Sequence, residues 1–234
     1  DKFFRIRRIQ NLMKEQGFAA IICRLSENVV YLTDYWPHHG FSVAILPQDG
    51  NPYLFVPEVE VEYAKSGWAE VEEFGWGLLK DGDLYANYRL WLTKMHNKLS
   101  LRGMKVGVEK SFEVTAPTYR SAEPVVPAGP WNGLLADIFA DAELEDAFDL
   151  ISVSRSVKGE YELEKMRIAN EISEMGINYA IEKLEPGMTE AQIGALVEYK
   201  IRADGPGYKG AKLMRANAEV AAGAVGSTKA TLLI

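Results

Sequence analysis

Three side chains capable of ligand chemistry stand together in one short loop, Tyr35-Trp-Pro-His-His-Gly-Phe41. The indole of Trp36 can form an aromatic wall, and the imidazoles of His38 and His39 can donate hydrogen bonds or carry charge near neutral pH. Together these groups could hold a ring and a carboxylate. Two other interpretations stay open, because such side chains also serve as subunit contacts or surface groups, and neighbouring histidines can join a metal site when further ligands converge.

The other reactive residue types give weaker signals. Cys23 is the only cysteine, which excludes an internal disulfide, and the apolar run before it predicts a buried small side chain. His96 falls inside a predicted helix, where a surface or boundary position is the simplest interpretation. The stretch Gly205-Pro-Gly-Tyr-Lys-Gly210 has the spacing of a dinucleotide-binding fingerprint, but a helix is predicted where that motif needs a strand. We expect a loop there. Core or interface packing is predicted for Trp76, Trp91 and Trp131.

The overall charge argues against several classes of partner. The 234 residues carry a net charge of −7, whereas binding to nucleic acid needs clustered Lys and Arg. The one basic cluster, Arg5, Arg7 and Arg8, lies in an amphipathic segment and is predicted to be a solvated helix face. No apolar run approaches the roughly 20 residues that span a bilayer, and the first residues lack the form of a signal peptide. We therefore expect no nucleic-acid partner, no membrane partner and a cytoplasmic location.

The elements that would position the loop alternate between strands and helices. Apolar runs bounded by turn residues predict strands at residues 18–23, 28–33, 41–46, 53–56, 71–74 and 105–109. Helical periodicity predicts helices at residues 3–16, 58–65 and 83–99. This alternation predicts an α/β fold in which helices cover a mixed sheet. The proline-bearing residues 116–130 are predicted to form a short strand and turns.

Helical periodicity then dominates from Trp131 to Ala203, with breaks predicted at residues 149–155 and at Pro186-Gly187. Apolar residues recur at helical spacing over residues 158–184. The next helix should begin at Thr189, because Gln192 three residues later completes a capping box. This change of pattern predicts two domains, residues 1–153 and 154–234.

Two parts of the chain resemble one enzyme superfamily. Arg155-Ser-Val-Lys158, Glu162-Leu-Glu-Lys-Met-Arg167 and Leu184-Glu-Pro-Gly-Met-Thr-Glu190, in this order, resemble the entrance to the pita-bread hydrolase domain of prolidases, aminopeptidase P and creatinases. Asn28-Val-Val-Tyr-Leu-Thr33, with the loop, strand and hairpin after it, resembles the creatinase-type N-terminal domain. The resemblance implies an N-terminal domain of that type followed by an incomplete pita-bread domain.

For the parent protein, the resemblance implies a metallohydrolase with two divalent ions, Mn, Co or Zn, held by two Asp, one His and two Glu. After Asp204 the only acidic residue is Glu219, and no histidine follows His96. We therefore expect the catalytic metal site to be absent from this chain, no metal to be bound by it, and no hydrolysis by this chain alone. We also expect both of its ends to be trimmed.

The resemblance gives the loop a role as well. In such enzymes the N-terminal domain of one subunit can close over the active site of its neighbour in a homodimer, so Trp36, His38 and His39 become candidates for contact with a proline-containing peptide. The predicted function is that of the N-terminal portion of an Xaa-Pro peptidase (a dipeptidase or aminopeptidase), serving oligomerisation and active-site capping.

One departure from the family keeps two alternatives open. Residues 221–230 lack the Pro-His pair that many family peptidases carry after a small-residue-plus-Gly turn. The alternatives are a non-catalytic binding module of the pita-bread family and a creatinase-like amidinohydrolase, which would act without metal.

Overall fold

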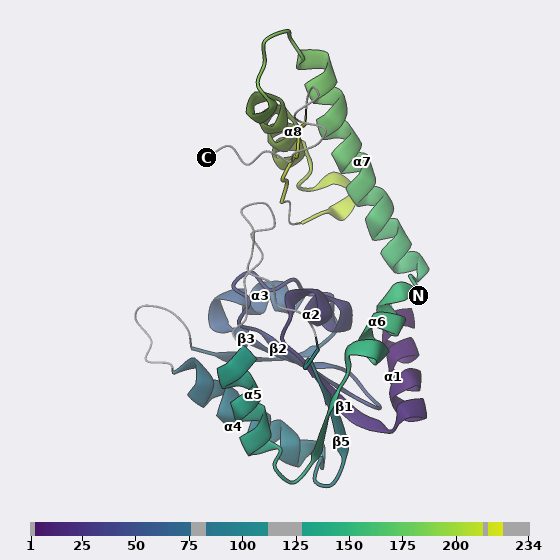
Figure 1. Ribbon diagram of the computed structural model, residues 1–234, viewed down its shortest axis with the longest axis vertical. Coiled ribbons are helices and arrows are strands. Elements are labelled where there is room, and N and C mark those ends of the chain that lie inside the picture. Colours follow the sequence, from purple (N-terminus) through teal and green to yellow (C-terminus); the bar gives the residue numbers. More distant parts are fainter. Residues whose placement is uncertain (1–2, 76–82, 112–127, 213–214, 222–234) are drawn as a thin grey trace. The chain divides into compact units, whose positions relative to one another are not determined.

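The computed structural model describes residues 3–75, 83–111, 128–212 and 215–221. Within them the chain forms two compact units, and the division falls between Gly159 and Glu160. The first unit is built on a six-stranded mixed sheet (Figure 1). Its strands are β1 (Phe18–Cys23), β2 (Val43–Pro47), β3 (Tyr53–Pro57), β4 (Glu70–Phe74), β5 (Lys105–Val108) and β6 (Glu143–Asp146).

The strand order is β4-β3-β2-β1-β5-β6. The strands β1, β2 and β3 are antiparallel neighbours, as the turn residues between β2 and β3 predict, whereas β4, β5 and β6 each join the sheet in parallel. At the centre, Ile21 of β1 lies opposite Leu46 of β2 on one side and Gly107 of β5 on the other. The predicted mixed α/β sheet is therefore confirmed.

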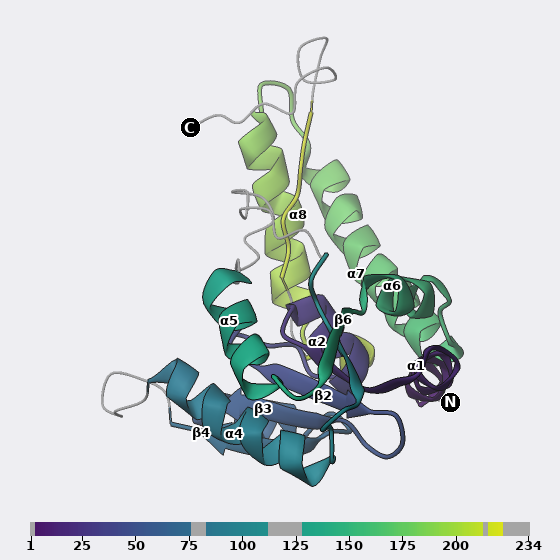
Figure 2. The same cartoon turned by 60° about the horizontal axis from the view of Figure 1, so that its bottom comes forward.

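Helices cover both faces of this sheet. On one face, α1, α2 and α6 pack on Ile21 and Cys23 of β1. On the other face, α4 and α5 pack on Ala20 and Ile22 of the same strand. Figures 1 and 2 show α4 and α5 together on their face of the sheet. The helices of the unit are α1 (Phe4–Gln16), α2 (Ser26–Thr33), η1 (Glu58–Glu60), α3 (Val61–Ala64), α4 (Leu84–Lys98), α5 (Ala128–Ile138) and α6 (Phe148–Ser156).

The prediction of a strand at residues 28–33 is wrong, because this segment forms the helix α2. Its β-branched residues favour a strand locally. In the fold, Glu109 lies at the N-terminal end of the helix and accepts hydrogen bonds from the backbone N–H groups of Arg24 (2.8 Å) and Leu25 (3.1 Å). An acidic group in that position complements the helix dipole. A contact with a residue distant in sequence thus overrides the local preference.

Two further predictions before the division need correction. Residues 149–155, predicted as a break in helical structure, belong to α6, and Phe148 at its start donates its N–H to Asp146 Oδ1 (3.2 Å). The strand β6 was not predicted, because its four residues are mostly acidic and lack an apolar run. The strand and turns predicted at residues 116–130 lie largely outside the described residues.

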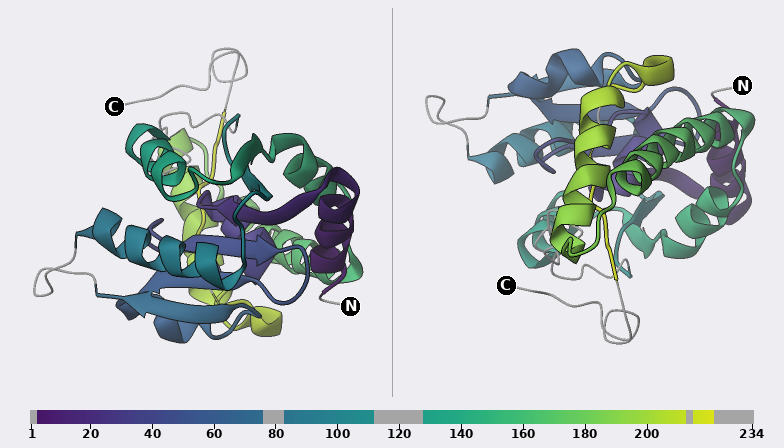
Figure 3. Two further views of the ribbon diagram at one scale, coloured as in Figure 1. Left: turned by 90° about the horizontal axis from the view of Figure 1, so that it is seen from below. Right: turned by 90° about the horizontal axis from the view of Figure 1, so that it is seen from above.

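The second unit is a helical pair, α7 (Glu160–Lys183) and α8 (Glu190–Asp204), followed by the short turn η2 (Tyr208–Gly210) (Figure 3). The capping box between Thr189 and Gln192 is confirmed. The two helices approach closely at Gly176, where an added Cβ would lie 2.7 Å from Ile201 Cγ1.

Candidate functional site

The loop that carries the candidate side chains begins at the C-terminal end of α2 and leads into β2. Asp34 ends the helix in the left-handed conformation (φ 61°). Beyond it Tyr35 turns inward and is buried, whereas Trp36 is 40% exposed and His38 and His39 are both exposed. The structure therefore brings the three predicted residues to the surface within one short stretch. Whether they touch a substrate stays a prediction.

A single buried carboxylate organises this loop. Glu60, the last residue of η1, is only 1% exposed. It accepts hydrogen bonds from the backbone N–H groups of His38 (2.8 Å) and His39 (3.3 Å), from Nδ1 of His39 (2.6 Å) and from the hydroxyl of Tyr35. Burial, together with the hydrogen bond to Glu60, holds the pKa of Tyr35 far above its ordinary value. The hydroxyl therefore remains a donor at neutral pH.

An exposed aromatic contact continues this arrangement. The ring of Tyr63, on α3, lies 4.8 Å from the ring of His38, and the two rings are tilted by 32°. Tyr63 is half exposed, and Val59 next to Glu60 is also exposed. The loop and the η1–α3 segment thus present aromatic, imidazole and aliphatic groups on the surface. Glu60 could not be identified from the sequence, because nothing local distinguishes it from Glu58 or Glu62.

The base of the loop is fixed by Arg5, which corrects the interpretation of the basic cluster. Arg5 is 7% exposed and donates hydrogen bonds to the carbonyl of Val30 (3.0 Å) and to Asp34 Oδ1 (3.0 Å). Its guanidinium also lies 4.4 Å from the ring centroid of Trp68. The solvated face predicted for the cluster is therefore wrong for Arg5, since a charge at this depth is retained when it is paired and stacked.

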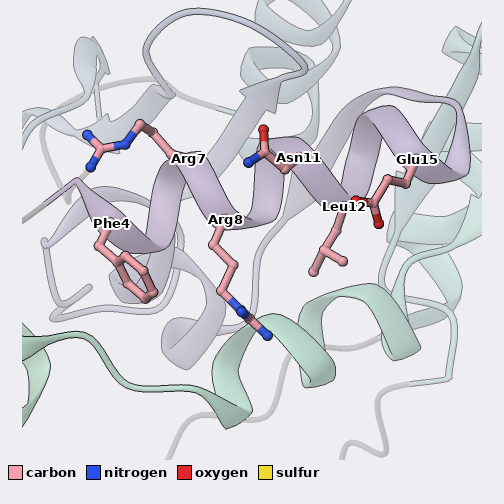
Figure 4. A pocket seen from close by; sticks show the side chains of 6 residues that line it. All are labelled: Phe4, Arg7, Arg8, Asn11, Leu12 and Glu15. Atoms are coloured by element: carbon pink, nitrogen blue, oxygen red, sulfur yellow. The ribbon is translucent and has the colours of Figure 1, made fainter.

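The neighbouring arginines line a shallow hollow along α1 (Figure 4). Figure 4 shows Arg7 and Arg8 pointing away from each other on opposite sides of the helix. The hollow measures about 380 Å³, and Glu15 lines it as well. All of its lining side chains come from this one helix, so it is an open surface feature with mixed charge.

A second buried acid lies where β1 and β5 end. Besides the amides at the start of α2, Glu109 binds Asn28 Nδ2 (2.7 Å), and Asn28 in turn accepts a hydrogen bond from Arg155 (2.9 Å). Burial raises the pKa of Glu109 and, with Glu109 nearby, that of the Cys23 thiol. A buried thiol with a raised pKa is a poor nucleophile. The packing role predicted for Cys23 is consistent with this environment, and this cluster joins β1, α2, β5 and α6.

An arginine inside an aromatic cage lies on the other face of the sheet. Arg24 is 4% exposed, and its guanidinium lies 5.0 Å from the ring centroid of Tyr88 and 4.9 Å from that of Trp131. Among the described residues, its Nε and Nη1 atoms have no hydrogen-bond partner. The two rings stabilise this buried cation through their π faces.

The remaining predicted residues have structural positions. His96 is nearly buried, and its Nε2 pairs with Asp141 Oδ1 (2.8 Å), so it is less exposed than predicted. Trp91 and Trp131 belong to the core, as predicted, and Trp76 lies outside the described residues. The glycine-rich stretch after α8 forms the turn η2, which follows a helix, so the loop prediction is confirmed.

The family-type metal centre is not found among the residues that the structure describes. Across these residues no three His, Cys, Asp or Glu side chains gather closely enough to hold a metal ion. The described residues therefore do not fit the dinuclear site. In the same portion of the chain, no helix is long and apolar enough to cross a bilayer.

Comparison with known proteins supports one family. The creatinase/prolidase N-terminal domain family matches residues 5–131, which is more than half of the chain. An uncharacterized peptidase of Staphylococcus saprophyticus is 24% identical over 203 residues, covering 86% of this chain and 50% of that protein. The chain thus spans about half the length of the curated relatives it matches.

Solved structures show the same fold. The recombinant prolidase from Thermococcus sibiricus matches with a TM-score of 0.64 at 21% identity, over 87% of this chain and 50% of the prolidase. The X-Pro aminopeptidase from Thermotoga maritima matches with a TM-score of 0.61 at 23% identity, over 82% of this chain and 48% of that enzyme. With its six-stranded mixed sheet and the match over residues 5–131, the chain belongs to the creatinase/prolidase N-terminal domain family.

Proposed function

We propose that this chain is the N-terminal portion of an Xaa-Pro peptidase of the prolidase or aminopeptidase P type. Residues 1–153 would form its N-terminal domain, and residues 154–234 would open its pita-bread catalytic domain. The family match over residues 5–131, the fold shared with a prolidase and an X-Pro aminopeptidase, and the division into two compact units near residue 159 support this assignment.

The role proposed for the portion described is oligomerisation and active-site capping. In a homodimer, Trp36, His38 and His39 would reach the active site of the neighbouring subunit and contact a proline-containing peptide. The observation that carries this proposal is the loop itself: these side chains are exposed, while the backbone beneath them is held by Glu60. An exposed recognition group on a fixed backbone loses little conformational entropy when it binds.

The chemistry would belong to the full-length protein. We expect that protein to require two divalent ions, Mn, Co or Zn, which would supply the activated water of a metallohydrolase. We expect this chain alone to bind no metal pair and to hydrolyse no peptide.

The test compares loop variants of the full-length protein in hydrolysis of Xaa-Pro dipeptides and longer Xaa-Pro peptides with added Mn, Co or Zn. Trp36→Ala and the double variant His38→Ala, His39→Ala should each raise KM about 5- to 30-fold, since a buried contact contributes roughly 1–2 kcal/mol. Leu90→Ala, on the exposed surface of α4, is the matched control and should leave KM unchanged. Light scattering should report a dimer.

Each alternative function predicts a different result. Unchanged kcat/KM in all loop variants would refute the capping role. Hydrolysis of creatine without metal would instead support an amidinohydrolase. Peptide binding without turnover under any metal would support a non-catalytic binding module.

A further inference from the structure

Glu60 has an unusual position for an acidic residue. It follows Glu58 and precedes Glu62, and Glu62 is a solvated side chain that pairs with Lys65. The Glu60 side chain, in contrast, is only 2% exposed. A carboxylate at this depth is costly unless hydrogen-bond donors surround it.

All the hydrogen bonds found for Glu60 come from one stretch of five residues. Oε2 accepts from the Tyr35 hydroxyl and from the His38 amide, and Oε1 accepts from the His39 amide and from His39 Nδ1. Both oxygens are therefore used twice, which matches the capacity of an ionised carboxylate. The loop satisfies the buried acid, and the acid in turn fixes the loop.

The contact with His39 also determines how its ring is presented. A carboxylate can only accept, so Nδ1 must carry the hydrogen, and the neutral ring is the Nδ1–H tautomer. The His39 side chain is 42% exposed, whereas that of its partner Glu60 is buried. His38 is held by two other contacts. Its backbone N–H donates to Glu60, and its ring lies against the ring of Tyr63, three residues after Glu60.

We propose that Glu60 is a positioning residue, which sets the backbone of residues 35–39 and fixes the orientation and tautomer of His39. The geometry stands by itself, while its meaning for substrate contact rests on the proposed function. A positioning residue of this kind does not itself touch a substrate. Glu60 acts through His38 and His39, which it holds toward the exterior.

The test is NMR spectroscopy of this chain with ¹⁵N labelling, comparing wild type, Glu60→Ala and Glu60→Gln. Glu62→Gln, two residues away and exposed, is the matched control. In Glu60→Ala, the amide hydrogens of His38 and His39 should exchange at least about tenfold faster, because hydrogen bonds to a charged acceptor are lost. The imidazole nitrogens of His39 should also shift from the Nδ1–H toward the Nε2–H tautomer. If Glu60 contributed only to the stability of the fold, its loss would not change that tautomer.

Two measurements distinguish a released loop from an unfolded protein. The amides of Ile21 and Ile22 in β1 report whether the core stays folded, and they should keep their protection. If Glu60→Ala does not fold, Glu60→Gln decides. The Gln side chain has one accepting oxygen where Glu60 has two, and each of those two oxygens binds one of the histidine backbone N–H groups. At least one of these two N–H groups must therefore exchange faster. Unchanged exchange and an unchanged tautomer in a folded variant would overturn the proposal.

Failure of this inference can be distinguished from failure of the proposed function. If Glu60 variants release the loop while Trp36→Ala leaves KM of the full-length protein unchanged, Glu60 positions the loop but the loop does not bind substrate. If Trp36→Ala raises KM while Glu60→Ala changes neither the exchange rates nor the tautomer, the capping role stands and the positioning role is refuted.

Discussion

Arg5→Ala tests whether a charge buried under α1 holds the base of the loop. The guanidinium donates to the carbonyl of Val30 and to Asp34, each at 3.0 Å, and stacks on Trp68. The substitution removes all three contacts. It leaves Asp34, whose side chain is 26% exposed, to be hydrated again by water.

The expected loss is about 3 kcal/mol of unfolding free energy. Hydrogen bonds to charged groups contribute roughly 1.5–3 kcal/mol each, and a desolvated cation–π contact contributes up to about 2 kcal/mol. The sum is reduced because Asp34 regains water. Arg5→Lys keeps the charge but loses the fork geometry and the stacking, so about 1–2 kcal/mol should be lost. Arg7→Ala, on the exposed side of the same helix, should change stability by less than about 0.5 kcal/mol.

The assay is urea unfolding followed by tryptophan fluorescence. Residues 160–234 contain no tryptophan, so the signal does not come from the helical pair of the second unit. The double variant Arg5→Ala, Asp34→Asn should lose less than the sum of the two single losses, because both substitutions break the same pair. The structural role of Arg5 is refuted if Arg5→Ala costs no more than Arg7→Ala, or if the losses of Arg5→Ala and Asp34→Asn simply add in the double variant.

Three further predictions concern other parts of the fold. Burial raises the pKa of Tyr88 to about 12, so the folded state keeps a proton that the unfolded chain loses near pH 10. The free energy of unfolding should therefore fall by up to roughly 2–3 kcal/mol between pH 10 and 12. Urea titrations of Tyr88→Phe should show a smaller fall. Thr189→Ala removes the side-chain acceptor of the capping box, so the free energy of helix unfolding, followed by circular dichroism, should fall by about 1 kcal/mol. In thermal unfolding, Gly107→Ala should destabilise the protein by about 1–3 kcal/mol, because the new Cβ would lie 2.9 Å from the Cβ of Ala147. Gly133→Ala is the control: this helical position has no atom within 4 Å of the new Cβ, so the protein should gain roughly 0.5–1 kcal/mol.

Local signals were sufficient for much of the architecture. The apolar run of β1, the turn residues between β2 and β3 and the capping box of α8 each depend on neighbours within a few positions. Gly17, which ends α1 at φ 77°, is another such signal. The motifs at residues 28–33, 155–158, 162–167 and 184–190, taken in this order, also predicted the family, which the match over residues 5–131 confirms.

The candidate site depended on contacts that no local pattern contains. The sequence placed Trp36, His38 and His39 in a loop, but it could not single out Glu60, which lies 22 positions beyond His38 and 21 beyond His39. Only the folded chain shows which of several similar glutamates is buried and surrounded by donors.

The same distinction explains the two clearest errors. Residues 28–33 have the composition of a strand, yet they form a helix because Glu109, 81 positions after Asn28, satisfies its N-terminal end. Arg5 belongs to an apparently solvated cluster, yet it is buried because Asp34 and Trp68 close over it. Sequence by itself determined the elements whose free energy comes from neighbouring residues. The tertiary structure decided the elements and charges whose hydrogen-bond partners, being distant along the chain, exist only after folding.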